Sequence, residues 1–493
     1  MADKHYDVLL VQPPLSNKLR YGRLSKHGPN SIPHGLADIA AFLEKKGINV
    51  GIYDGMALSH TVEEAILEIK KLKPSIIGVS FVTPAYGVVK DLISKLRKEM
   101  PSSLIVLGGA HPTVLPKETL QEFLDVDLLV LGEGEITFYE IVKAFQEKKP
   151  YNNIDGIAYH NINNEIEITN PRQIIKNLDD IPLPAWHLLP MHVYRPTTSR
   201  YRKLPSFSLL TSRGCPMNCA FCSQTIGRQL RLMSVGKVME QIDILAKKYG
   251  AKELIFYDSS FTLNRRHAWE ICEELIRSKR NKEFSWSCET RTDMVDLELL
   301  KLMRRAGCWS IHYGVESGSQ RLLNKMNKKI KLEQIEEVFN MTKKVGIHTV
   351  AFFMLGIPTE TREETLKTIE LAKKLKPHFA QFTITVPFPG TPLFEMAKSN
   401  GTFRADDWNG YQTWAGWKGQ ELIYVPEGRT AKEMMQLQQY AMKSFIMQPR
   451  IILLHLANVI RYPVLLRRYL DAFFILLEII VKNKLSNSKQ KQL

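Results

Sequence analysis

Residues 212–222 read Ser-Arg-Gly-Cys-Pro-Met-Asn-Cys-Ala-Phe-Cys and hold half of the six cysteines of the chain. Cys215, Cys219 and Cys222 follow the spacing Cys-x3-Cys-x2-Cys. Three thiolates this close can bind three irons of a [4Fe–4S] cluster, which leaves the fourth iron open to a small chelating molecule. A zinc ion usually takes four ligands in paired spacings, and no second cysteine pair follows. The spacing therefore favours an iron–sulfur cluster over a zinc site.

The other residues of this run suit a cluster-binding loop. Gly214 lets the backbone turn sharply before the first ligand, Pro216 stiffens the loop, and Phe221 would shield a cluster from water. The run resembles the signature of radical S-adenosylmethionine (SAM) enzymes, in which the methionine end of SAM chelates the fourth iron. The resemblance implies two cofactors for this part of the chain, a [4Fe–4S] cluster and SAM.

Length, cysteine content and charge limit the class of protein. A chain of 493 residues has room for two or three domains. Six cysteines are too few for a disulfide-stapled secreted protein, and residues 1–7 contain no apolar signal segment, so we expect a cytoplasmic protein. The net charge of +16 could indicate a nucleic acid or membrane partner, but by itself such a charge more often marks a solvated Lys-rich surface. No nucleic-acid partner is expected.

Residues 1–150 alternate short apolar runs with helical patterns. The runs predict strands at residues 7–11, 49–54, 75–80, 104–107 and 127–131. Such alternation predicts an α/β fold with a doubly wound, flavodoxin-like parallel sheet. Ligands of these sheets bind beyond the carboxyl ends of the strands.

The loops at those strand ends contain Gly-Gly-x-His-Pro-Thr at residues 108–113 and Gly-Glu-Gly-Glu at residues 132–135. They resemble the loops of the cobalamin-binding domain that precedes many radical SAM domains, and the resemblance implies that residues 1–150 bind cobalamin. The candidate cofactor-binding residues are Ser80, Thr83, Gly108, Gly109, His111, Thr113, Gly132 and Glu133. Without the resemblance, the same residues fit ordinary strand-to-helix turns.

No histidine is expected on the cobalt. The motif Asp-x-His-x-x-Gly, which supplies this ligand in the cobalamin-dependent mutases, is absent. His111 is the nearest candidate, but it stands beside Pro112 in a predicted turn, and we expect it to form a local hydrogen bond.

Residues 151–205 are expected to form a linker with a small hairpin turning at residues 163–164. The strand–helix alternation then resumes. Six strands are predicted at residues 207–210, 254–257, 284–288, 309–313, 350–354 and 381–384. They indicate a partial (β/α)6 barrel over residues 206–400, whose chemistry lies at the carboxyl ends of the strands.

The resemblance to radical SAM enzymes assigns roles to polar residues after these strands. Arg291 would pair with the SAM carboxylate. Glu316 and Ser317 would bind the ribose hydroxyls or the amino group, and Asp258 and Ser260 would do similar work. Gly356 would line the adenine. A surface salt bridge or a helix cap is the structural alternative for each of them.

The remaining sequence is expected to be structural or peripheral. Cys272, Cys288 and Cys308 lie in helix or strand contexts typical of small buried hydrophobes, and nothing indicates a second cluster. Residues 401–493 are predicted to be mainly helical. An aromatic group there either faces a flat or lipid-like substrate at the barrel mouth or packs as a collar over the barrel. This group comprises Trp408, Tyr411, Trp414 and Trp417.

The tail after residue 441 contains nine Lys or Arg and two acidic residues beside interrupted apolar runs. No run reaches the length needed to cross a bilayer. The tail therefore either docks on the inner face of an anionic membrane or packs on the barrel as a helical lid.

Together, these features resemble the family of class B radical SAM methyltransferases, the anaerobic magnesium-protoporphyrin monomethyl ester cyclase and hopanoid-modifying enzymes. The resemblance implies reductive cleavage of SAM to a 5′-deoxyadenosyl radical, an electron donor such as flavodoxin or ferredoxin, and methylation of an unactivated carbon in a hydrophobic or cyclic metabolite. An oxidative cyclase or ring-modifying enzyme is the alternative within the family.

Two further alternatives belong to other classes. A non-enzymatic cobalamin or iron–sulfur sensor would not need SAM-binding residues at the strand ends. A tRNA methylthiotransferase needs cysteines in its N-terminal domain, whereas the first cysteine here is Cys215.

Overall fold

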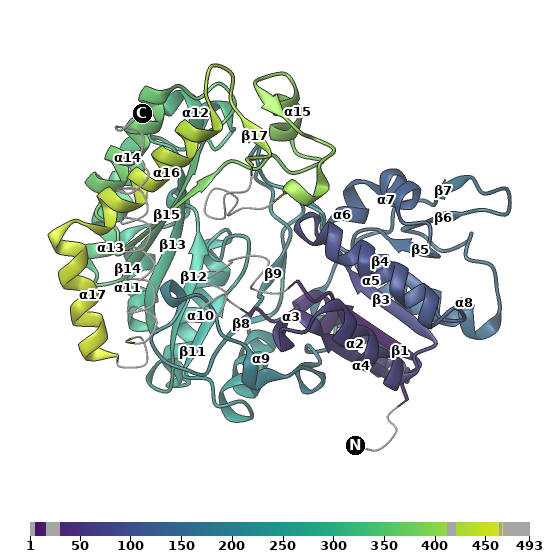
Figure 1. Cartoon of the computed structure of the whole chain (residues 1–493). Helices are drawn as coiled ribbons and strands as arrows, with labels where there is room; N and C mark the ends of the chain where they lie inside the picture. Colours follow the sequence, from purple (N-terminus) through teal and green to yellow (C-terminus); the bar gives the residue numbers. More distant parts are fainter. Residues whose placement is uncertain (1–4, 16–29, 412–420, 463–465, 467–493) are drawn as a thin grey trace.

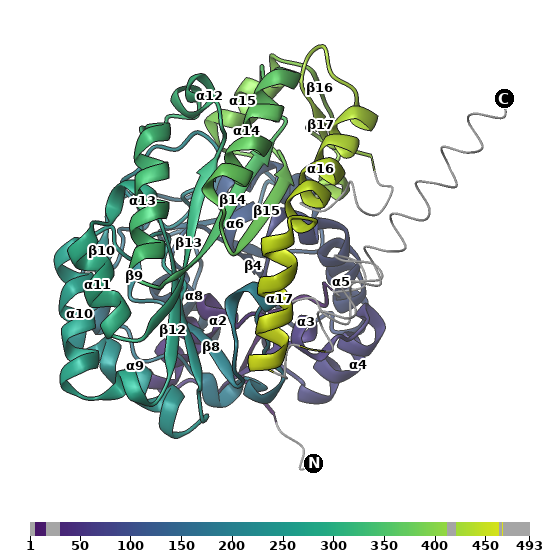
Figure 2. The same cartoon turned by 90° about the vertical axis from the view of Figure 1, so that its left-hand side faces the viewer.

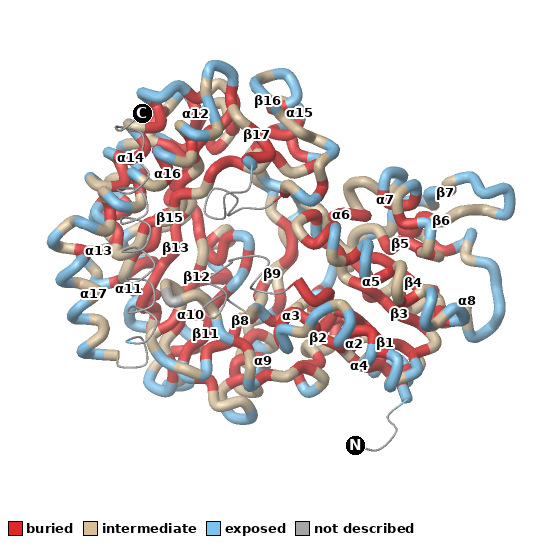
Figure 3. The backbone as a smooth tube through the Cα atoms, viewed as in Figure 1, coloured by how far each residue is buried: buried red, intermediate tan, exposed pale blue. Residues whose placement is uncertain are grey.

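The computed structural model describes residues 5–15, 30–411, 421–462 and 466. Figure 1 shows two lobes side by side, an N-terminal lobe built on one parallel sheet and a larger barrel lobe. In both lobes the parallel strands are largely buried, while the helices expose their outer faces (Figure 3). This layering is what alternating apolar strands and amphipathic helices produce.

The N-terminal lobe contains a seven-stranded sheet in the order β2-β1-β3-β4-β5-β6-β7. Its parallel strands are β1 (Val8–Gln12), β2 (Val50–Asp54), β3 (Ile76–Ser80), β4 (Leu104–Gly108) and β5 (Leu128–Val130). All five predicted strands are confirmed. The chain adds β2 on one side of β1 and then β3, β4 and β5 on the other side, as in a doubly wound sheet.

Helices cover both faces of this sheet. Leu9 and Val11 belong to one core layer with α4 (Val62–Leu72) and α5 (Tyr86–Glu99). Val8 and Leu10 belong to the opposite layer with the helices of the other face. Those helices are α2 (His34–Lys45) and α8 (Gly134–Glu147), and the shorter helices of the lobe are α3 (Gly55–Leu58), α6 (Ala110–Val114) and α7 (Pro116–Glu122).

The hairpin expected in the linker is present, and it extends the first sheet. β6 (Ile157–His160) pairs antiparallel with β5, and β7 (Ile166–Ile168) pairs antiparallel with β6. Asn164 has φ +62° in the turn between them. The hairpin therefore completes the edge of the N-terminal lobe.

The barrel lobe contains six parallel strands in the consecutive order β15-β14-β13-β12-β11-β8. They are β8 (Ser206–Leu209), β11 (Glu253–Phe256), β12 (Ser285–Thr290), β13 (Cys308–Glu316), β14 (His348–Leu355) and β15 (Phe379–Ile384). The outer helices are α9 (Val235–Lys247), α10 (Arg265–Arg277), α11 (Leu297–Arg305), α12 (Gln320–Lys325), α13 (Leu332–Lys344) and α14 (Arg362–Leu375). The predicted partial barrel is confirmed. Cys272, Cys288 and Cys308 are buried in its core, as expected.

In the described residues, the region after the barrel is mainly helical, as predicted, and it also contains a small two-stranded sheet. α15 (Pro392–Lys398) leads to a two-stranded sheet of β16 (Thr402–Phe403) and β17 (Tyr424–Val425), and α16 (Ala431–Ile446) and α17 (Pro449–Arg461) follow. Gln438 of α16 donates to the carbonyl of Phe382 on β15 at 3.0 Å, so α16 covers the last barrel strand (Figure 2). None of the helices in the described ranges is long and apolar enough to cross a membrane.

The described part of the aromatic group does not lie where either alternative placed it. Trp408 donates from its indole nitrogen to Glu122 at 3.0 Å, and its ring meets that of His111 at a centroid distance of 5.3 Å. Tyr411 is fully buried in the same core layer of the N-terminal lobe. These two side chains therefore join the lobes. Trp414 and Trp417 lie outside the described residues.

Three histidines meet at the base of the barrel, where α17 packs. His348 and His378 stack at a centroid distance of 3.9 Å, and His455 of α17 lines the same small cavity. Burial lowers the pKa of His348 to about 4, that of His378 to about 3 and that of His455 to about 4. The three imidazoles therefore pack here in their neutral form.

We expect acid to weaken this packing. Because the folded-state pKa values lie below that of a free histidine, the unfolded chain binds protons first as the pH falls below about 6.5, and stability is lost towards pH 4. Replacing His348 by Phe keeps a ring against His378 but removes one titrating group. Between pH 7 and pH 5, the free energy of unfolding should fall by about 1–2 kcal/mol less in that variant than in the wild type. An identical pH dependence in H348F and the wild type would contradict this explanation.

Candidate cofactor site between the two lobes

The cysteine run forms the loop between β9 (Ser212–Arg213) and β10 (Arg231–Leu232), which pair antiparallel. Gly214 has φ +81°, and a Cβ atom there would collide with the backbone of Gln229 and Gly227. A glycine is therefore required at the point where the chain turns into the first cysteine.

The three thiols of the loop are the candidate ligands of the cluster. None of the three thiols forms a disulfide. The residues Cys215 and Cys219 are partly buried, and the residue Cys222 is exposed. Burial of the thiol, together with the neighbouring Cys215 and Cys219, raises the pKa of Cys222. Nowhere in the described residues do three His, Cys, Asp or Glu side chains converge as the ligands of one ion do. Cysteines that bind three different irons of a cluster do not need to converge in this way.

The loop is held from outside by backbone contacts. The Ala220 amide donates to the carbonyl of Met326 at 2.8 Å, and the Leu393 amide donates to the carbonyl of Ala220 at 2.8 Å. The Asn327 side chain donates to the carbonyl of Asn218 at 2.8 Å. Segments after β13 and β15 therefore fix the middle of the cysteine run.

Arg291 contacts the cysteine loop directly. Its guanidinium donates to both carboxylate oxygens of Asp293 at 2.9 and 2.8 Å, to the carbonyl of Lys328 at 2.6 Å and to Cys219 Sγ at 3.4 Å. A cation beside a cluster thiolate tunes its potential. The predicted pairing of Arg291 with the SAM carboxylate stays a prediction, and it would have to coexist with these contacts.

Asp258 supports the strand that leads into the loop. One carboxylate oxygen accepts from the Thr211 amide at 2.8 Å and from the Ser212 hydroxyl at 2.7 Å, and the other accepts from the Thr211 hydroxyl at 3.1 Å. Burial raises the pKa of Asp258, and these hydrogen bonds partly oppose that rise. With both oxygens hydrogen-bonded and the side chain buried, Asp258 anchors this loop, and its predicted role toward SAM stays a prediction.

The other predicted SAM residues also make internal contacts. Glu316 has φ +67° at the end of β13 and forms a buried ion pair with Lys328 at 2.7 Å. Ser317 accepts from the Ser319 amide at 3.1 Å, and Ser260 shares a hydrogen bond with the Thr290 hydroxyl at 2.9 Å. Gly356 follows β14 with φ +79°. All four lie at carboxyl ends of barrel strands, as predicted, and their roles toward SAM stay predictions.

A cavity lies between the lobes at the carboxyl ends of β3 and β4. Six of the eight candidate cobalamin residues line it: Ser80, Gly108, Gly109, Thr113, Gly132 and Glu133. The barrel side is lined by Ser212, Arg213, Tyr257 and Ser259 among others. The cavity therefore connects the strand ends of the N-terminal lobe with the residues just before the cysteine loop.

The floor of the cavity is mostly backbone. A Cβ atom at Gly108 would make ordinary van der Waals contact with Val130, at 3.7 Å, and would not collide with it. Gly109 has φ +106°, and a Cβ there would collide with the backbone of Phe81. Thr113 donates to the Gly109 carbonyl at 2.7 Å and accepts from the Gly132 amide at 3.0 Å, which fixes the two loops together. The glycines at these two positions leave backbone at the carboxyl end of β4, which allows the close approach of a ligand.

Two candidate residues lie behind this floor. His111 is buried, shares a hydrogen bond of 3.0 Å with the Thr83 hydroxyl and stacks on Phe81 at 4.3 Å. The local hydrogen bond expected for His111 is thus present, and the absence of a histidine on cobalt stays a prediction. Sequence reasoning missed His34, which lines the cavity and shares a hydrogen bond of 2.8 Å with Ser208 of β8.

Sequence reasoning also missed a buried ionic network across the lobe boundary. Arg213 pairs with Asp38 at 2.8 Å, with Glu133 at 3.1 Å and with Glu135 at 2.5 Å, and Arg231 pairs with Glu133 at 2.8 Å. Hydrogen bonds from Arg231 and the Ile175 amide hold the pKa of Glu133 below its usual value despite burial. Burial raises the pKa of Asp38 to about 6 in spite of Arg213. Arg213 stands two residues before Cys215, so the network ties the cysteine loop to the N-terminal lobe.

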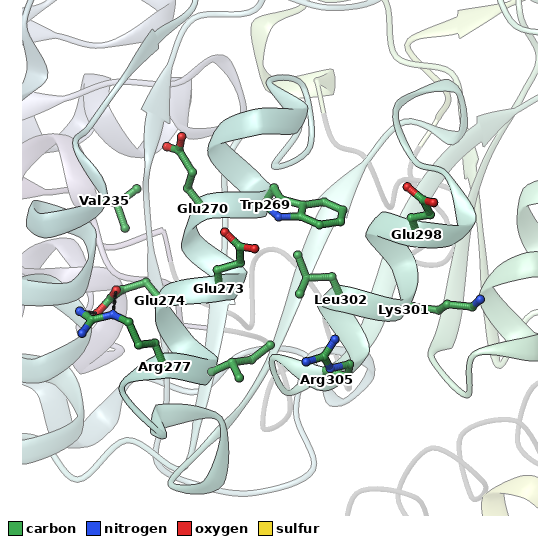
Figure 4. A pocket seen from close by; sticks show the side chains of 11 residues that line it. Val235, Trp269, Glu270, Glu273, Glu274, Arg277, Glu298, Lys301, Leu302 and Arg305 are labelled. Carbon is green, nitrogen blue, oxygen red and sulfur yellow. Dashed lines mark hydrogen bonds and ion pairs between the residues drawn. The ribbon is translucent and has the colours of Figure 1, made fainter.

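A broad surface hollow lies elsewhere, on the outer side of α10 and α11 (Figure 4). Trp269 and Leu302 line it, and charged side chains such as Glu270 and Lys301 surround them. None of the candidate cofactor residues contributes to this hollow.

The comparisons with known proteins agree with this geometry. Residues 24–142 match the B12 binding domain, and residues 209–372 match the radical SAM superfamily. Both matches lie inside the predicted domains. TsrM from Kitasatospora setae, solved with cobalamin and a [4Fe–4S] cluster, has the same fold, with a TM-score of 0.70 at 18% identity over 90% of each chain.

Two curated relatives define the family. An uncharacterized methyltransferase of Pyrococcus horikoshii is 34% identical over 90% of this chain and 94% of its own length. The anaerobic magnesium-protoporphyrin IX monomethyl ester cyclase of Rubrivivax gelatinosus is 32% identical over 74% of this chain and 66% of its own length. The chain belongs to the family of B12-binding radical SAM enzymes. Its cofactors are a [4Fe–4S] cluster, SAM and cobalamin.

The ionic network predicts a large effect for Arg213→Met. Removing the guanidinium leaves Asp38, Glu133 and Glu135 buried together without this partner, and breaking a buried pair typically costs about 3–5 kcal/mol. The thermal midpoint of unfolding should fall clearly. Lys70→Met, which removes the exposed ion pair with Glu99, is the matched control and should change the midpoint far less. Equal midpoints for R213M and K70M would contradict a stabilising role for the network.

Proposed function

We propose that this enzyme methylates an unactivated carbon of a hydrophobic or cyclic metabolite. The observation that carries the proposal is the single cavity lined both by the strand ends of the B12 lobe and by Ser212 and Arg213, which lead into the cluster loop. When bound there, SAM and the cluster supply a carbon-centred radical chemistry, and methylcobalamin supplies the methyl group.

The residues of the chain have separate tasks in this scheme. Cys215, Cys219 and Cys222 would hold the cluster, and Arg291 places a positive charge beside Cys219. The backbone at Gly108 and Gly109 and the hydroxyl of Ser80 would hold the corrin, as the family resemblance implies.

The lining of the cavity supports a hydrophobic or cyclic substrate. Apolar side chains from the sheet and its helices contribute much of the wall: Leu10, Ile39, Val79, Val106, Val130 and Phe138. The barrel contributes Leu210 and Ile226. Such a wall excludes water from a reactive radical.

Oxidative cyclisation is the second candidate. It is favoured by the 32% identity to the Rubrivivax cyclase, of whose length the match covers 66%. The two reactions differ in the mass of the product, because methyl transfer adds one carbon and cyclisation does not.

Anaerobic incubation with SAM, methylcobalamin, dithionite and cell extract tests the proposal. Mass spectrometry should find 5′-deoxyadenosine and a metabolite heavier by one methylene equivalent. The variant with Cys215, Cys219 and Cys222 all replaced by Ala should contain no cluster iron and form neither product. Full iron content in that variant would refute the assignment of the cluster, and product without a methyl gain would favour cyclisation.

The protein is proposed to act in the cytoplasm, with a flavodoxin or ferredoxin as electron donor and with the C-terminal helices against the inner face of the membrane.

The membrane contact is proposed from the surface of α17. This helix exposes Leu453, Leu456 and Ile460, with exposed fractions of 65%, 57% and 81%. These residues are spaced along one helical face, and Arg461 ends the helix. An apolar face flanked by basic residues suits an anionic bilayer surface.

Co-sedimentation with vesicles tests this contact. The protein should pellet with anionic vesicles more than with neutral ones, and salt should weaken the binding because the Debye length shortens. Leu453→Ser combined with Ile460→Ser should reduce the bound fraction severalfold, since each leucine-sized side chain contributes about 1.5–3 kcal/mol on burial. Equal pelleting with both vesicle types at any salt concentration would contradict the proposal.

A further inference from the structure

A basic segment borders the cluster loop on its outer side. Residues 325–331 read Lys-Met-Asn-Lys-Lys-Ile-Lys, and Glu333 is the one acidic residue between positions 320 and 335. Asn327 has φ +53° and Lys329 has φ +55°, so the segment turns tightly between α12 and α13.

This segment is fixed to the cysteine loop by three contacts. Its Met326 carbonyl accepts from the Ala220 amide, and its Asn327 side chain donates to the Asn218 carbonyl. The Lys328 ammonium pairs with buried Glu316 and lies 5.3 Å from the ring centroid of Phe221. Lys328 thus anchors the segment inside the protein, and its neighbours stand at the surface beside the cluster.

Those neighbours are cations without acidic partners. Lys329 and Lys331 are exposed and Lys325 is half-exposed, and none of them forms a salt bridge within the described part of the chain. On the other side of the loop, exposed Arg228 donates to the carbonyl of Met217 at 3.4 Å. Three positive side chains therefore come from the segment that contacts the cysteine loop and a fourth, Arg228, from the loop itself, in which Cys222 is exposed.

Two acidic groups close to the loop already have basic partners, while exposed Glu333 follows the basic segment. Glu316 pairs with Lys328, and Asp293 pairs with Arg291. An ordinary solvated surface mixes both signs of charge, whereas a surface of one sign attracts an oppositely charged partner and raises its association rate.

We propose that Lys325, Lys329, Lys331 and Arg228 form the docking surface for an acidic electron-carrier protein. The inference rests on the proposed function, because the cluster must receive one electron before SAM is cleaved. In the docked complex the reduced carrier loses one electron, and the oxidised cluster at Cys215, Cys219 and Cys222 gains it. The cations bring the carrier to the edge of the loop where protein covers the cluster least.

Charge reversal separates docking from catalysis. The variant Lys329→Glu/Lys331→Glu is compared with Lys117→Glu/Lys432→Glu, which makes the same charge change at exposed positions on α7 and α16. Each protein is loaded with its cluster and assayed for 5′-deoxyadenosine formation, once with photoreduced flavodoxin and once with dithionite. Dithionite is a small reductant that needs no docking surface.

The expected result is a fall of about tenfold or more in the flavodoxin-driven rate of K329E/K331E at low salt, within the range that electrostatic steering covers. The difference should shrink at high salt, and the dithionite-driven rate should equal that of the control variant. Equal flavodoxin-driven rates in the two variants would overturn the docking surface. An equal loss with dithionite would also overturn it, because the segment would then belong to the cofactor site. If dithionite yields no 5′-deoxyadenosine even in the wild type, the proposed function fails instead.

Discussion

Arg213 reaches across the boundary between the lobes and places its guanidinium among Asp38, Glu133 and Glu135. A buried charge of this kind is stable only while its partners stay in place, because desolvation of an unpaired ion costs several kcal/mol. The two lobes therefore cannot slide apart without exposing or separating these charges. Since Arg213 is two residues from the first cluster cysteine, the position of the cluster loop is set by the cobalamin lobe as well as by the barrel.

The cluster loop contains little regular secondary structure, and contacts with the surrounding barrel residues determine its shape. Gly214 provides the turn, Asp258 anchors the preceding strand, and residues after β13 bind the middle of the loop. Arg291 completes this shell by contacting Cys219 and the carbonyl of Lys328. Each contact comes from the carboxyl end of a different barrel strand, which is where a (β/α) barrel places its chemistry. The same ring of strand ends faces the cavity of the B12 lobe.

Local patterns were enough to predict all eleven parallel strands, because buried parallel strands are nearly continuous apolar runs. The cysteine spacing and the glycine-rich loops were likewise local signals. The network of Arg213 was not predictable in this way, since Arg213 and Asp38 are separated by 175 positions. Trp408 was misplaced for the same reason, because its partner Glu122 lies 286 positions away. Asp258 shows a different limit: a carboxylate at a strand end fits SAM binding and loop support equally well until its hydrogen-bond partners are known.

The central claim is that the cysteine loop, through Thr225 and Ile226, and the candidate cobalamin residues meet at one cavity between the lobes. Electron paramagnetic resonance of the protein loaded with both the reduced cluster and Co(II) cobalamin tests this most directly. If the two paramagnetic centres face each other across the cavity, their signals should be broadened or split relative to those of protein loaded with either cofactor alone. A spectrum equal to the simple sum of the two singly loaded spectra would contradict the shared cavity.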